Sequence, residues 1–117
     1  MARKIVLGLL WLAASLPALG QTSREAFCER VADAIYIAEG GANTRFPYGV
    51  RSIQTSDPRR VCVASVRNNL RRWDAAGRPG EFIAFMGRRY CPPDAHPLNR
   101  HWVKNVTHHL NAQTPKP

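Results

Sequence analysis

The segment 34–41 carries an apolar helical pattern into a glutamate, Glu39, and then into two consecutive glycines. On a helix with about 3.6 residues per turn, Glu39 lies on the same face as the apolar side chains of Ile35 and Cys28. Gly40 is a residue type that commonly ends a helix. The chain is therefore expected to turn directly after a carboxylate that faces its interior.

The surroundings predicted for Glu39 favour its protonated form. Burial penalises a negative charge, and so does the negative end of the helix dipole. A carboxyl group that stays neutral near neutral pH can act as a general acid. The alternative is a surface glutamate at a helix end, paired with one of the many arginines of the chain.

The first 20 residues have the layout of a secretory signal peptide. Arg3 and Lys4 precede an apolar run that is short for a membrane span, and Ala18 and Gly20 are small residues typical of a cleavage site. We therefore expect cleavage after residues 1–20, export to the periplasm or outside the cell, and no stable membrane anchor. A retained N-terminal anchor is the alternative.

Residues 21–117 form a stretch of 97, which suits one small domain. Of the 17 Lys and Arg, Arg3 and Lys4 leave with the signal, so 15 remain against 8 Asp and Glu, a net charge of +7. Such a chain is expected to bind an anionic partner. Nucleic acid would fit this charge, but an exported protein meets acidic cell-wall polymers instead, so no nucleic acid is expected. We expect a monomer.

The remaining pattern predicts a mainly α fold with a short β-like excursion after the first helix. Residues 42–54 lack a helical period, and their Pro, Gly, aromatic and β-branched residues indicate a loop with a short strand or hairpin. Helices are expected at 22–39, 58–76, 81–86 and 98–112. Gly77 and Gly87 are expected to end the second and third of these helices, and the tail 113–117 to be disordered.

Three cysteines, Cys28, Cys62 and Cys91, follow the signal segment. An oxidising compartment favours a disulfide, and the odd number leaves one thiol over or a link to another chain. We predict a Cys62–Cys91 bridge, because Cys91 lies in the irregular segment 88–97, which needs a tether. Cys28 lies on an apolar helix face, where a thiol can simply belong to the core.

Two neighbouring motifs can be compared with a known family. The first is Tyr36-x-Ala-Glu39-Gly-Gly, and the second is Tyr48-Gly49-Val50-x-Ser52-Ile53-Gln54. Together they resemble the catalytic segment of the lysozyme-like superfamily, in particular soluble lytic transglycosylases and goose-type lysozymes. The match covers about 20 residues. The resemblance implies a small lysozyme-like helical domain in which Glu39 is the general acid and base.

The resemblance also implies a substrate site beside Glu39. It places a set of six residues at the sugar chain: Tyr48, Gly49, Val50, Ser52, Gln54 and Tyr90. Tyr90 enters this set as a replacement for the tyrosine of an Ala-Tyr-Asn-Ala-Gly segment, which is typical of transglycosylases and absent here. The chain departs from the family in two further ways: the spacing from Glu39 to Gly49 is short, and Gly-Val-Arg-Ser-Ile-Gln stands where Gly-Leu-Met-Gln is usual.

The implied function is cleavage of the MurNAc-GlcNAc glycosidic bond of peptidoglycan, without a cofactor. A hydrolase normally needs a second carboxylate at the scissile bond. Asp57, Asp74 and Glu81 are expected to have structural positions, which leaves Asp94 as the one candidate. This scarcity favours a transglycosylase over a hydrolase. The alternative is a catalytically inactive, basic wall-binding or inhibitor module with the same fold.

The histidines do not indicate a metal site. His101 and His108 are seven residues apart on one helix, whereas helical metal pairs prefer a spacing of three or four. His96 is expected in a loop. We therefore predict solvent-facing or capping histidines and no bound metal.

Overall fold

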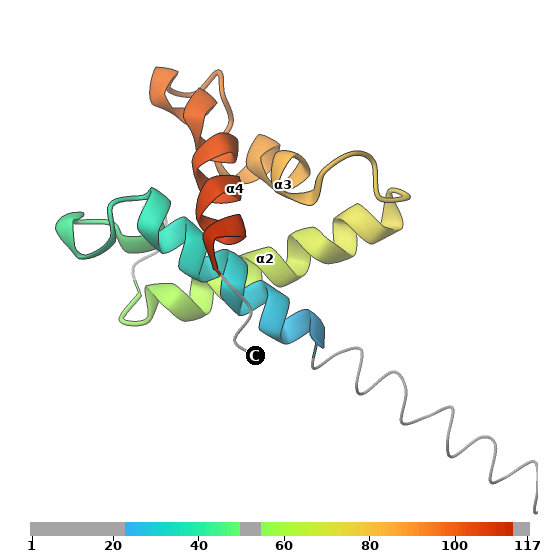
Figure 1. Cartoon of the computed structure of the whole chain (residues 1–117), viewed down its shortest axis with the longest axis horizontal. Coiled ribbons are helices and arrows are strands. Elements are labelled where there is room, and N and C mark those ends of the chain that lie inside the picture. The colour runs from blue at the N-terminus through green and yellow to red at the C-terminus, as the bar shows by residue number, and fades with distance from the viewer. Residues whose placement is uncertain (1–22, 50–54, 114–117) are drawn as a thin grey trace, which may run out of the picture.

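A computed structural model of the chain describes residues 23–49 and 55–113. The fold is mainly helical, as predicted, and neither of these two ranges contains a strand. The first helix covers residues 23–38 of the described chain. It is followed by η1 (Gly41–Asn43), η2 (Pro47–Gly49), α2 (Pro58–Ala75), α3 (Phe82–Tyr90), η3 (Pro97–His101) and α4 (Trp102–Ala112) (Figure 1).

Two predicted features lie outside the described residues: the signal peptide at residues 1–20 and the tail from residue 114 onward. Within the described ranges, no helix combines the length and the apolar character that crossing a membrane requires.

Helix α2 begins and ends where the sequence predicts. The Asp57 carboxylate accepts a hydrogen bond from the backbone N–H of Arg60 at 3.0 Å, and Pro58 occupies the first helical turn. Gly77, with a φ of +85°, follows the last turn. Local capping residues therefore set both ends of α2.

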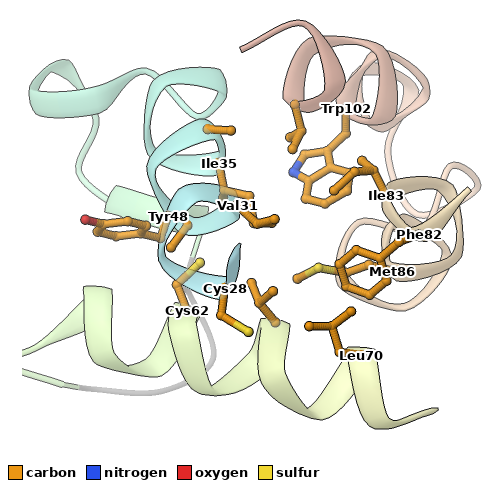
Figure 2. Packing of buried hydrophobic residues seen from close by; sticks show 14 residues of the cluster. Cys28, Val31, Ile35, Tyr48, Cys62, Leu70, Phe82, Ile83, Met86 and Trp102 are labelled. Atoms are coloured by element: carbon orange, nitrogen blue, oxygen red, sulfur yellow. The ribbon is translucent and has the colours of Figure 1, made fainter. Parts of the chain in front are cut away.

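The first helix and α4 run in opposite directions along each other. Gln113, just beyond α4, donates its side-chain N–H to the Arg30 carbonyl at 2.8 Å, while Trp102 at the other end of α4 reaches Glu39. Helices α2 and α3 close the core from the other sides (Figure 1). Figure 2 shows the buried cluster that results, which includes Cys28, Val31, Ile35, Cys62, Leu70, Phe82, Met86 and Trp102.

The prediction that Gly87 ends the third helix is wrong. Helix α3 continues through Gly87 to Tyr90, and Gly87 is buried. A Cβ atom at this position would lie 2.8 Å from Cγ2 of Val103 and 3.1 Å from the ring of Trp102. The glycine is therefore a contact point at which α4 packs directly on the backbone of α3.

The described part of the predicted β-like excursion is not a hairpin. Residues 41–49 form the short turns η1 and η2. Positive φ angles at Gly40, Gly41, Tyr48 and Gly49 bend the chain repeatedly, so it cannot extend into a strand here. Residues 50–54 lie outside the described residues.

Candidate active site

A cleft of about 690 Å³ opens beside the end of the first helix. Its lining includes Glu39 and Gly49 together with residues from the end of α3 to the first turn of α4. The lining residues are Ala38, Glu39, Gly49, Tyr90, Cys91, Pro92, Ala95, His96, Leu98, Asn99, His101, Trp102 and Asn105.

Glu39 lies at the point where the first helix ends. Its backbone N–H donates to the Ile35 carbonyl at 2.9 Å, and Gly40 then takes a left-handed φ of 103°. Its carboxylate accepts a hydrogen bond at Oε1 from the indole N–H of Trp102, with a distance of 3.0 Å. The side chain is half-buried, so the carboxyl group is fixed by the protein and still borders the cleft.

Gly49 packs against the carboxylate of Glu39. Its φ is +69°, and a Cβ atom there would lie 3.1 Å from both Cδ and Oε1 of Glu39. Only a residue without a side chain allows this approach without moving the carboxyl group. Gly49, which the resemblance places at the sugar chain, is one of the residues that line the cleft, and its contact with Glu39 fixes the place of the carboxyl group.

Tyr90 lines the cleft and joins it to the core. Its hydroxyl donates to the Tyr48 carbonyl and lies 3.7 Å from Sγ of Cys62. Its ring packs on Trp102 with centroids 5.5 Å apart. Burial, together with the neighbouring Cys62 thiol and the charge of Glu39, raises the pKa of the Tyr90 phenol. Tyr90 therefore stays protonated at neutral pH and serves as a hydrogen-bond donor.

The other residues implied by the resemblance do not all reach the cleft. The Tyr48 side chain is buried, packs on Tyr36 at 5.1 Å between ring centroids, and accepts a hydrogen bond from Arg59. Figure 2 shows its hydroxyl pointing away from Trp102. The structure thus uses the backbone carbonyl of Tyr48 at the site and not its ring. Val50, Ser52 and Gln54 lie outside the described residues.

Three other acidic side chains form ion pairs, and none of these three lines the cleft. Asp33 pairs with Arg59, and Glu25 pairs with Arg67. Asp74 pairs with Arg24 and Arg78, and these arginines lower the pKa of its carboxyl group. Asp94 is exposed and does not line the cleft. Among the described residues, Glu39 is therefore the single carboxylate of the cleft lining.

The predicted Cys62–Cys91 disulfide is not formed. The described residues include all three cysteines, and each carries a thiol. Cys62 is fully buried with its sulfur beside the Tyr90 hydroxyl, whereas Cys91 lies in the cleft wall. Hydrogen bonds replace the expected tether: the Pro92 carbonyl accepts from the Asn99 side chain at 2.7 Å and from the Ala95 backbone N–H at 3.1 Å.

Alkylation of the native protein should separate the three thiols. Burial raises the pKa of Cys62 to about 11 and also raises that of Cys28, so both stay as unreactive thiols at pH 8. We expect iodoacetamide to modify Cys91 first, and Cys28 and Cys62 only after unfolding, as read by intact mass. If two thiols resisted alkylation in denaturant until a reductant was added, the protein would contain a disulfide, contrary to this expectation.

Two histidines lie in the cleft wall, His96 and His101. Nδ1 of His96 accepts a hydrogen bond from the Leu98 backbone N–H at 3.1 Å and caps η3, so at least this histidine has a structural use. The part of the chain that the structure describes has no cluster of three or more His, Cys, Asp or Glu that could hold a metal ion.

Trp102 is the site residue that sequence reasoning missed. It lies on the buried face of α4, with 5% of its surface exposed. A buried indole N–H needs a hydrogen-bond acceptor, so the sequence could have indicated that Trp102 has a polar partner. The acceptor, Glu39, lies 63 positions away in the sequence.

No protein-family model, curated protein or solved structure matches this chain. Its function is therefore inferred from the geometry around Glu39 and from the motif that surrounds this residue.

Proposed function

We propose that this protein is an exported peptidoglycan-cleaving enzyme of the lytic transglycosylase type, with a lysozyme-like helical domain over residues 21–117. The observation that carries the proposal is the placement of Glu39. Its carboxyl group borders a cleft of about 690 Å³ and is fixed by Trp102 and Gly49. The cleft has the size of a small-molecule site, and we expect it to hold a short stretch of a glycan strand.

In the proposed reaction Glu39 acts first as an acid and then as a base. Its carboxyl proton passes to the oxygen of the MurNAc-GlcNAc bond, and the bond between this oxygen and the anomeric carbon breaks. The resulting Glu39 carboxylate then takes the proton of the 6-hydroxyl of the same MurNAc residue. That hydroxyl oxygen attacks the anomeric carbon, so the product carries a 1,6-anhydro ring and the acid is regenerated.

The distribution of carboxylates supports this route over hydrolysis. A hydrolase needs a second Asp or Glu at the scissile bond, as nucleophile or as base for a water molecule. The described cleft lining offers none besides Glu39, because Asp94 is exposed outside it. Intramolecular attack by the sugar requires no second carboxylate.

The charge of the chain agrees with a wall substrate. The peptide stems of peptidoglycan carry carboxylates, and a net charge of +7 over residues 21–117 attracts such polymers. Arg100 and Lys104 are two exposed cations of this charge, and in the sequence they are next to the cleft residues His101 and Asn105.

The released products test the proposal. Purified peptidoglycan incubated with the protein should yield muropeptides with 1,6-anhydro ends, which mass spectrometry separates from hydrolysis products by the loss of one water. Reducing ends would indicate a hydrolase and direct attention to an Asp94→Asn variant. Binding to the wall without release of any fragment would favour the inactive wall-binding or inhibitor module.

A further inference from the structure

The indole of Trp102 is held in place from two sides. On one side the ring faces the backbone of Gly87, where even a Cβ atom would lie 3.1 Å from Cε3 and Cζ3. On the other side it packs on Tyr90, whose hydroxyl is in turn bonded to the Tyr48 carbonyl. Figure 2 shows the indole nitrogen turned toward the first helix. The direction of the N–H group is therefore set by the packing of α3 and α4.

The chemistry of this donor is one-sided. An indole N–H donates a hydrogen bond, does not accept one, and cannot take up a proton at physiological pH. The carboxyl oxygen that receives it, Oε1 of Glu39, acts as an acceptor in this contact. In a protonated carboxyl group the carbonyl oxygen is the stronger acceptor, so this contact favours the hydrogen on the other oxygen, Oε2.

We propose that Trp102 is a positioning residue that holds Oε1 of Glu39 as an acceptor and thereby presents Oε2 as the oxygen that exchanges the proton with the substrate. This inference rests on the proposed function. It assigns to one oxygen both proton transfers of the reaction, outward to the glycosidic oxygen and back from the 6-hydroxyl. The geometry suits this sequence, because the partner on Oε1 cannot divert the proton.

The proposal has a consequence for titration. A hydrogen bond donated to a carboxylate favours the charged form. Removal of the Trp102 N–H should therefore raise the pKa of Glu39, and the alkaline limb of the pH–activity profile, which reports loss of the acid's proton, should move to higher pH. A purely structural role of Trp102 would lower stability without moving this limb.

The chain offers a matched control in Trp73. Its indole N–H also donates to a protein acceptor, the Gly80 carbonyl at 3.3 Å, and its ring also packs on an aromatic side chain, Phe82. Trp73 does not line the cleft. Trp102→Phe and Trp73→Phe therefore remove the same group from two packed rings, and one of these groups contacts Glu39.

The test combines NMR with kinetics on the whole protein. In the unmodified protein, the Nε1–H signal of Trp102 should shift with the same midpoint as the side-chain carboxyl carbon of Glu39, and the signal of Trp73 should not. In Trp102→Phe the Glu39 midpoint and the alkaline limb should both move to higher pH, and turnover should fall by about 10-fold, since a fixed acid is lost. Trp73→Phe should leave all three unchanged.

The inference is overturned if the Trp102 signal does not follow Glu39, or if a folded Trp102→Phe protein titrates at Glu39 like the unmodified one. The first of these measurements needs no variant, so a Trp102→Phe protein that fails to fold does not remove the test. Failure of the proposed function is a separate result, namely unmodified protein that releases no muropeptide. The titrations still decide whether Trp102 holds Glu39.

Discussion

Glu39→Gln should reduce the release of muropeptides by about 10²–10⁴-fold, because it removes the proton that the leaving oxygen must receive. This loss corresponds to about 3 to 5 kcal/mol of activation free energy. Folding should be retained, since the glutamine side-chain oxygen can still accept the indole N–H of Trp102. The measurement is zymography on purified cell wall, with thermal unfolding of the same sample to confirm the fold.

Asp94→Asn is the matched control for the loss of a carboxylate. Asp94 is exposed on the loop between α3 and η3, outside the cleft lining, so this variant should clear the wall like the unmodified protein. If Glu39→Gln also cleared the wall normally, Glu39 would not be the acid. If Asp94→Asn alone lost activity, the reaction would need a second carboxylate and hydrolysis would replace transglycosylation.

Gly49→Ala should also lose most of the activity, by about 10- to 100-fold. The new Cβ atom would stand 3.1 Å from the carboxyl carbon of Glu39, so the carboxylate must move by a few tenths of an ångström. Small displacements of a reacting group have kinetic costs of this size. Initial rates of muropeptide release, measured on protein shown to be folded, give the effect.

Gly80→Ala is the control that distinguishes the effect of the contact with Glu39 from the effect of backbone strain. Gly80 has a φ of +70°, close to the +69° of Gly49, but a Cβ atom there would meet no other atom within 4 Å. Both variants should therefore lose stability by a similar amount, about 1 kcal/mol or somewhat more, for placing alanine in the left-handed region. Equal activity of the two variants would show that Gly49 does not position Glu39.

The regular parts of this fold follow from local sequence signals. Asp57 and Pro58 set the start of α2, and Gly77 sets its end, because capping depends on side chains and φ angles within one turn. The end of the first helix at Glu39 and Gly40 follows in the same way. These interactions span a few residues, so the order of residue types is enough to predict them.

Gly87 and Tyr48 show where the sequence was insufficient. A glycine that ends a helix and a glycine that lets a second helix pack closely give the same local sequence pattern. At Gly87 the second case holds, because Trp102 and Val103 of α4 pack against its backbone. Tyr48 was assigned to the sugar site through the resemblance, but its positive φ of 64° and its contact with Tyr36 turn the ring into the core. Both outcomes depend on tertiary packing.

Only the part of the candidate site that depends on local sequence features could be predicted. Glu39 could be found because its apolar face and the adjacent glycines are local features. The disulfide was predicted from the expected compartment and from the irregular segment around Cys91, whereas the structure places Sγ of Cys62 beside the Tyr90 hydroxyl. The partner of Glu39 could not be found, because no local pattern relates a residue on the first helix to one on the last.

The distance in sequence between Glu39 and Trp102 also bears on when the protein can act. The two residues are 63 positions apart, and Tyr90 and Tyr48, which support them, are 42 apart. A chain that has emerged only as far as α3 has the acid but lacks the indole that orients it. In the proposed enzyme, the acid is therefore fully oriented only when α4 has docked on the first helix.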